Sequence, residues 1–225
     1  MILKKTFLQF FIILFFFLNI GGKLYAQETE NLSLQQIEKK ADRLEDDGKH
    51  LEAIQLYQKI IKQENNNGSV YNKIGMCYFY LKDYEKAKDN FRLAVLYTQD
   101  DEVILSNLSA AYNYTDDGDK AFHYAMKAYE VKKTSQTLIN VIATANNIDR
   151  QDEAIKIYES APSEIKDHPR VWFVIARSNY EIGNYTEAVE IYTKAFENHE
   201  PSKKFPVKIQ EEKYYYYYSI TQLLK

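Results

Sequence analysis

The chain has 225 residues, of which 45% are hydrophobic and 27% charged, with only seven glycines and four prolines. Such a composition is globular, poor in loop formers and favourable to helices. The net charge of −3 argues against a nucleic-acid surface, which needs a basic face, and the single cysteine, Cys77, excludes an internal disulfide.

The first 26 residues have the order of regions found in a secretory signal peptide. Lys4 and Lys5 form a basic start, the run from Phe7 to Ile20 is almost wholly apolar, and the letters GGKLYA supply helix breakers and small residues. The apolar run is too short to span a bilayer comfortably. We expect cleavage after Ala26, an N-terminal segment at 27–33, no stable membrane span afterwards, and a periplasmic or secreted protein. An uncleaved anchor is the alternative.

Small residues recur along the chain at intervals of 33 or 34. One series is Ala53, Ala87, Ala121, Ala154 and Ala188, and the other is Ala41, Gly75, Ser109, Ala143 and Ala176. In each unit apolar residues around the first series follow the i, i+4, i+7 stripe of a helix, and turn formers separate it from a second stripe. Each unit is therefore expected to be two antiparallel helices. A single hairpin cannot bury its own apolar face, so the units must stack.

This spacing resembles the tetratricopeptide repeat family. The second unit carries the pattern on Tyr71, Ile74, Gly75, Tyr78, Tyr84, Ala87, Phe91 and Ala94. The fifth unit carries it on Trp172, Ile175, Ala176, Gly183, Tyr185, Ala188, Tyr192, Ala195 and Pro201.

The resemblance covers residues 34–202 as five repeats. Their expected bounds are 34–67, 68–101, 102–135, 136–168 and 169–202. The fourth repeat is one residue short, and we place the loss in its turn, IDRQD, between Ala143 and Ala154. The resemblance implies an all-α, right-handed α-solenoid of about five antiparallel helix pairs. It also implies a concave surface, lined by the first helices, of the kind that usually binds a peptide or protein segment.

Nothing in the sequence predicts an enzyme, a cofactor or a metal site. No two of His50, His123, His168 and His199 have helical metal-ligand spacing, and neither a nucleophile motif nor a phosphate-binding glycine loop is present. Three carboxylates, Glu38, Asp42 and Glu45, share one face of the first helix. A solvated acidic face explains them better than a cation site.

The side of each first helix opposite the packing stripe gives candidate binding residues. The candidates are Asn72, Met76, Phe79, Asn107, Asn113, Asn140, Asn147, Phe173, Arg177 and Tyr180. Asparagine amides both donate and accept, so they can pair with any peptide backbone. Phe79 and Phe173 could anchor apolar side chains, and Arg177 could hold a carboxylate. The alternative is that these residues form only the hydrated inner face of a solenoid.

These features favour an exported, non-enzymatic scaffold that binds a partner protein or peptide of unknown identity. Two alternatives stay open: a sensor or regulatory domain of an envelope system, and a structural spacer that stacks with itself.

The C-terminal residues 203–225 are expected to be a linker and a capping helix. Pro206 bars a helix through the linker. The tyrosine run would then cover Ile191, Tyr192 and Ala195, with Ser219 as the small residue. Helical phase places Tyr214, Tyr215, Tyr218, Gln222 and Leu223 near one stripe. A β-strand and an aromatic docking site are the rival interpretations.

Overall fold

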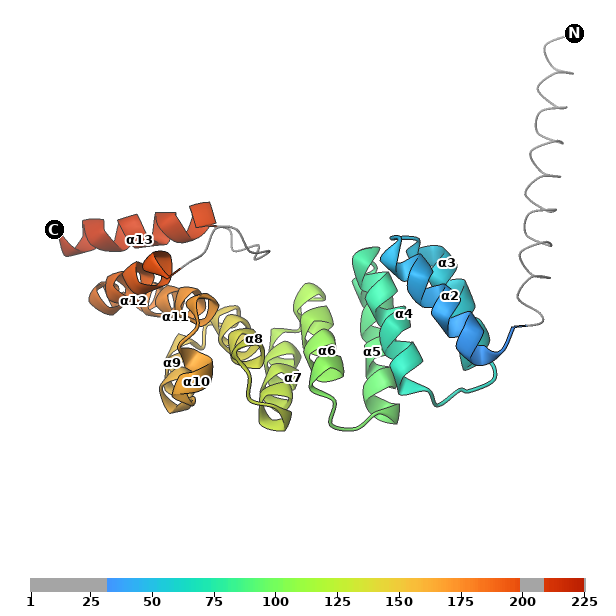
Figure 1. Cartoon of the computed structure of the whole chain (residues 1–225). Helices are drawn as coiled ribbons and strands as arrows, with labels where there is room; N and C mark the ends of the chain where they lie inside the picture. The colour runs from blue at the N-terminus through green and yellow to red at the C-terminus, as the bar shows by residue number, and fades with distance from the viewer. Residues whose placement is uncertain (1–31, 199–208, 225) are drawn as a thin grey trace, which may run out of the picture. The chain divides into compact units, whose positions relative to one another are not determined.

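The computed structural model describes residues 32–198 and 209–224 (Figure 1). The expected signal peptide, most of the 27–33 segment, His199, Pro201 and the linker with Pro206 lie outside these residues. The described chain is all-α and contains no strand, as expected. Its helices are α2 (Leu34–Asp46), α3 (His50–Ile61), α4 (Gly68–Tyr80), α5 (Tyr84–Tyr97), α6 (Glu102–Tyr114), α7 (Gly118–Val131), α8 (Ser135–Asn146), α9 (Gln151–Ser160), α10 (Ser163–Lys166), α11 (Pro169–Glu181), α12 (Tyr185–Glu197) and α13 (Ile209–Leu223).

The chain divides into two compact units, and the first ends at Asn66. It contains the pair α2 and α3, whose small residues Ala41 and Ala53 are fully buried. The ring of Tyr57 is also fully buried, and its hydroxyl lies 2.7 Å from Asp42 Oδ1 and 2.8 Å from Glu45 Oε2. Two of the three carboxylates on the expected acidic face therefore serve as acceptors for a core tyrosine.

The second unit begins at Asn67 and contains α4 to α13. Successive helices pack as antiparallel pairs, α4 with α5, α6 with α7, α8 with α9 and α11 with α12, and neighbouring pairs stack (Figure 1). Small residues allow the close approach that the sequence predicts. Ala87, Ala121 and Ala188 have no exposed surface, and a methyl group added at Gly75 would come within 2.6 Å of the Phe91 ring.

The register of the fourth repeat differs from the expected one. Helix α8 buries Leu138, Val141 and Ile142, whereas Ala143 is partly exposed. Ile142 therefore occupies the place that Gly75 has in α4, and the repeat begins at 135 instead of 136. The second helix starts the same number of residues after the first in every pair, so the missing residue lies between α7 and α8, not in the turn IDRQD.

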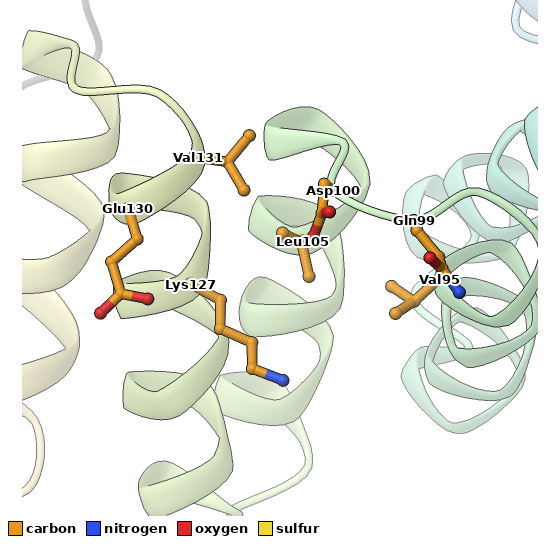
Figure 2. Close-up of a pocket in the computed structure, with 7 residues that line it drawn as sticks. All are labelled: Val95, Gln99, Asp100, Leu105, Lys127, Glu130 and Val131. Carbon is orange, nitrogen blue, oxygen red and sulfur yellow. The ribbon is translucent and has the colours of Figure 1, made fainter.

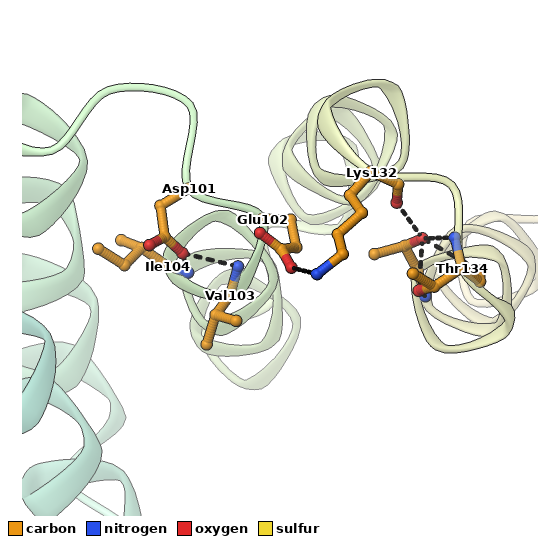
Figure 3. A network of polar contacts seen from close by, with 7 residues as sticks. Asp101, Glu102, Val103, Ile104, Lys132 and Thr134 are labelled. Atoms are coloured by element: carbon orange, nitrogen blue, oxygen red, sulfur yellow. Dashed lines mark hydrogen bonds and ion pairs between the residues drawn. The ribbon is translucent and has the colours of Figure 1, made fainter.

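A short polar network holds this three-residue link between α7 and α8 (Figure 3). The Thr134 hydroxyl accepts the backbone N–H of Thr137 at the start of α8, and the Thr137 hydroxyl donates to the Lys132 carbonyl at 2.8 Å. The Lys132 ammonium lies 2.7 Å from the Glu102 carboxylate on α6. The cap satisfies the first amide groups of α8, and the link is one residue shorter than the link between α5 and α6.

Helix α13 caps the last pair, which confirms the expected capping helix and excludes a strand for the tyrosine run. It packs on α12 and α11. Ser219 is fully buried as expected, and Tyr215 and Tyr216 join the cluster that contains Tyr192 and Ala195.

The buried stripe of α13 is, however, not the expected one. Glu212, Tyr215, Tyr216 and Ser219 follow the i, i+3, i+4, i+7 pattern of a single helix face and face α11 and α12. Tyr214, which was expected on the stripe, is 59% exposed. Tyr218 and Leu223 are also exposed, so the true stripe is rotated relative to the expected one.

Candidate functional site

The expected binding residues of α4 and α6 surround a small apolar cavity. It has a volume of about 100 Å³ and is lined by Met76, Phe79, Tyr80, Phe91, Asn107 and Ala110. Phe91 comes from α5 and is fully buried, while Tyr80 is 58% exposed. The cavity thus opens on the side of the unit that carries the exposed residues of α4, α6, α8 and α11, which we call the first-helix face.

Asparagine amides connect successive first helices on this face. Asn107 Nδ2 donates to Asn72 Oδ1 at 3.0 Å, joining α6 to α4. Asn147 Nδ2 donates to Asn113 Oδ1 at 2.9 Å, joining the end of α8 to α6. A side-chain amide carries two N–H groups and an oxygen with two lone pairs. Each contact therefore uses only some of the hydrogen-bond donors and acceptors of the two amides.

The structure corrects the expected residues on α8, because the register is shifted by one. Asn140 accepts from Gln136 Nε2 at 2.9 Å on its own helix, and Thr144 is buried and donates to the Asn140 carbonyl. The residues equivalent to those on α4 are Ile139, Ala143 and Asn146. Asn146 was missed: its amide accepts from Ser178 Oγ on α11 at 2.9 Å. The small side chain of Ala143 beside Ile142 was the misleading signal.

The expected anchors on α11 are covered. Phe173 is only 2% exposed and packs edge-on against Phe196 with centroids 5.1 Å apart, so it cannot receive a peptide side chain. Arg177 donates to Glu181 at 2.8 Å, and its guanidinium lies 5.1 Å from the Tyr215 centroid. Tyr180 lies 4.9 Å from Tyr215. Helix α13 thus contacts the α11 end of the first-helix face.

The partly buried carboxylate of Glu212 lies at the same contact. The Tyr192 hydroxyl donates to Glu212 Oε2 at 3.0 Å. Burial raises the pKa of Glu212 to about 7, although the Tyr192 hydrogen bond and the charge of Arg177 oppose that rise. Burial likewise raises the pKa of the Tyr192 phenol. These groups form a contact that holds α13 against α12.

An aromatic group that the sequence analysis missed borders the cavity. The rings of Tyr84 and Tyr114 stack with centroids 4.4 Å apart, and both meet Phe79 edge-on at 5.2 and 5.3 Å. Tyr114 is 55% exposed. Phe79 and Tyr114 are separated by one repeat plus one residue, and this spacing could have predicted that their rings meet.

Other chemistry is accounted for by structural roles. Cys77 is fully buried, and His168 caps α11 by accepting the Arg170 N–H at 3.2 Å, while burial lowers its pKa. In residues 32–198 and 209–224, no group of three or more His, Cys, Asp or Glu residues could hold a metal ion. None of the helices in those ranges is long and apolar enough to cross a membrane.

Comparisons with known proteins agree with this geometry. A sequence model of the tetratricopeptide repeat matches residues 68–101 and 169–198. The BBSome complex member BBS4 of Bos taurus is 28% identical over 95 residues, which are 42% of this chain and 18% of that protein. The chain therefore corresponds to a small part of this relative.

Solved structures share the fold. MamA superposes with a TM-score of 0.64 at 22% identity, over 70% of this chain and 92% of MamA. YrrB, described as a TPR protein with an unusual peptide-binding site, gives 0.64 at 18% identity, over 77% and 90%. PilF of Pseudomonas aeruginosa gives 0.61 at 13% identity, over 84% and 90%. Residues 68–101 and 169–198 thus match the tetratricopeptide repeat, and the stacked helix pairs around them have the fold of these solved structures.

Proposed function

We propose that the chain is a non-catalytic scaffold that holds an extended peptide or protein segment of a partner on the first-helix face. Tetratricopeptide repeat proteins bind protein or peptide partners, and YrrB, which shares the fold, has a peptide-binding site of its own. The observation that carries the proposal is the apolar cavity between α4 and α6, with an amide pair beside it.

The size and chemistry of the cavity define what it takes. A volume of about 100 Å³ suits one aliphatic side chain, whereas sites for drug-sized molecules occupy roughly 300–1,000 Å³. Met76 and Phe79 supply an apolar lining, so a leucine, isoleucine or methionine side chain is favoured. Asn72 and Asn107 would bind the backbone on either side of that anchor, because amides accept and donate without regard to sequence.

A photo-crosslinking experiment in the native host tests this proposal. Benzoylphenylalanine replaces Tyr80, which lines the cavity, or Leu96, which is 64% exposed on α5. We expect one defined protein band from position 80 that is absent from position 96. Ala110→Phe fills the cavity and should abolish the band, while Leu96→Ala should leave it. Equal labelling from both positions, or persistence of the band in Ala110→Phe, would reject this face.

We further propose that the scaffold is exported and acts in the periplasm or outside the cell. The order of basic, apolar and small residues in the first 26 positions supports this proposal. Mass spectrometry of the native protein should find an N-terminus near Gln27. An intact Met1 in a membrane fraction would show instead that the segment is kept as an anchor.

A self-associating spacer is a second candidate, favoured by the outer side of α13. Tyr217 is 60% and Leu224 81% exposed, and such residues are an apolar surface on which a second copy could stack. Sedimentation of the purified chain over a hundredfold concentration range distinguishes the two functions. A monomer throughout that range contradicts the spacer and leaves the scaffold.

A further inference from the structure

A second hollow lies where α5, the start of α6 and the end of α7 meet. It shares no residue with the cavity on the first-helix face. Its volume is about 490 Å³, and it is lined by Val95, Gln99, Asp100, Leu105, Lys127, Glu130 and Val131 (Figure 2). These residues come from α5, the link to α6, the first turn of α6 and the second half of α7. The aliphatic side chains form an apolar surface with polar groups around it.

The second repeat fills the corresponding place with aromatic rings. Leu105 and Val131 stand one repeat of 34 residues after Tyr71 and Tyr97. Those two tyrosines stack on each other, with ring centroids 5.7 Å apart and planes 20° from parallel. The third repeat keeps the backbone positions but has an aliphatic side chain at both of them, so its pair lacks two rings.

The fifth repeat shows what Lys127 does when a ring is present. Lys194 has the same position on α12 as Lys127 on α7, and Trp172 has the same position on α11 as Leu105 on α6. The Lys194 ammonium lies 4.1 Å from the Trp172 ring centroid, well within the range of a cation–π contact. In the third repeat no ring stands at position 105. The Lys127 side chain extends from α7 at the border of the hollow (Figure 2), and its ammonium lies 5.6 Å from the ring centroid of Tyr124 on the same helix.

We propose that this hollow binds a tyrosine or tryptophan side chain of a partner protein, which supplies the ring that the third repeat lacks. The ring packs on Val95, Leu105 and Val131, and its face lies against the Lys127 ammonium. The phenol O–H or indole N–H donates to the Asp100 carboxylate at the rim, because such groups need a hydrogen-bond partner when they are buried. The site is separate from the first-helix face, so either site can exist without the other.

Nuclear magnetic resonance titration of the ¹⁵N-labelled full chain tests the proposal. The probes are N-acetyl-tyrosinamide and N-acetyl-tryptophanamide, with N-acetyl-leucinamide as the matched aliphatic control. We expect saturable shifts at the amides of Leu105, Lys127 and Val131 with the aromatic probes only. Equal shifts with the leucine probe, or shifts confined to the cavity that contains Met76, would overturn it.

Variants separate the contributions within the hollow. Leu105→Tyr with Val131→Tyr rebuilds the ring pair of the second repeat and should abolish the aromatic shifts. Val131→Tyr alone changes a side chain that is 40% exposed, so this variant should fold. It therefore still tests the hollow if the double variant fails to fold. Lys127→Ala should weaken binding about two- to fivefold, as expected for an exposed cation–π contact. Ala110→Phe should change nothing here, and binding that survives Val131→Tyr and Lys127→Ala undiminished refutes the site.

Discussion

Replacing Glu212 by glutamine should make the docking of α13 independent of pH. The carboxyl group is partly buried where α13 packs on α12 and α11, and it accepts a hydrogen bond from Tyr192. Glutamine keeps the shape and the accepting oxygen but carries no charge. It therefore removes the titration while leaving the packing of the cap in place.

The size of the effect follows from the pKa of the group in the two states. Burial raises the pKa of Glu212 from 4.5 to about 7 in the folded chain. That value of the pKa already includes the opposing effects of the Tyr192 hydrogen bond and the Arg177 charge, and the smaller upward effects of Glu211 and Glu181. Between pH 4.5 and 7 the folded chain binds a proton that the unfolded chain has released, so stability falls as the pH rises. At about 1.4 kcal/mol per pH unit, the loss above pH 7 is about 3 kcal/mol.

The assay is the difference in unfolding free energy between Glu212→Gln and the unmodified chain, measured in urea from pH 4 to pH 8. This difference cancels every other titration. It should increase by about 3 kcal/mol in favour of the variant across the window and be flat outside it. Hydrogen exchange of the α13 amides should show the same pH dependence in their protection, since stacked repeats open from their ends.

Glu211→Gln is the matched control, because Glu211 is the neighbouring carboxylate on α13 and is 39% exposed beside Arg177. A pH-dependent difference of the same size for Glu211→Gln would show that the effect does not come from the burial of Glu212. A flat difference for Glu212→Gln across the window would show that the carboxyl group is hydrated, and the reasoning from its burial would fail.

Three further changes test the packing of the repeats. Ala87→Leu, at a position with no exposed surface, should cost about 1–3 kcal/mol by overpacking and loosen residues 70–95 first in hydrogen exchange; unchanged protection there would contradict the helix register. Deletion of residues 212–225 should lower the melting temperature and promote aggregation, because it uncovers the cluster of α11 and α12; a truncated chain as stable and monomeric as the full one would contradict the capping role. Tyr57→Phe should destabilise the first unit by about 1–3 kcal/mol, because Asp42 and Glu45 lose their donor; urea denaturation measures the loss, and an unchanged free energy of unfolding would show that the hydroxyl contributes nothing.

Much of the fold could be predicted from the sequence because each repeat needs small residues where its two helices approach closely. The small residues at Gly75, Ala87 and Ala121 recur with the helix pairs, and the structure buries all of them. The fourth repeat shows the limit of this reasoning. Two adjacent residues, Ile142 and Ala143, both satisfy an apolar pattern, and the structure buries Ile142 while leaving Ala143 partly exposed.

The candidate site was less predictable, because exposure depends on elements far away in the sequence. Met76, Phe79 and Asn107, which the pattern placed on the same face, line one cavity. The pattern could not show that Phe173 is buried or that Arg177 contacts Tyr215. Phe173 packs against Phe196 of α12, whereas the contact of Arg177 depends on the rotation of α13 about its axis. A run of five tyrosines leaves that rotation undetermined, since every face of the helix presents the same side chain.

The amide pairs on the first-helix face also have a mechanical consequence. Asn72 with Asn107 and Asn113 with Asn147 act as ties between consecutive repeats, on the side where a ligand would lie. A bound backbone that takes over these amides loosens the ties and lowers the stiffness of the stack at that joint. A longer ligand would then loosen more of the contacts between repeats, so the flexibility of the protein would depend on how many repeats its ligand spans.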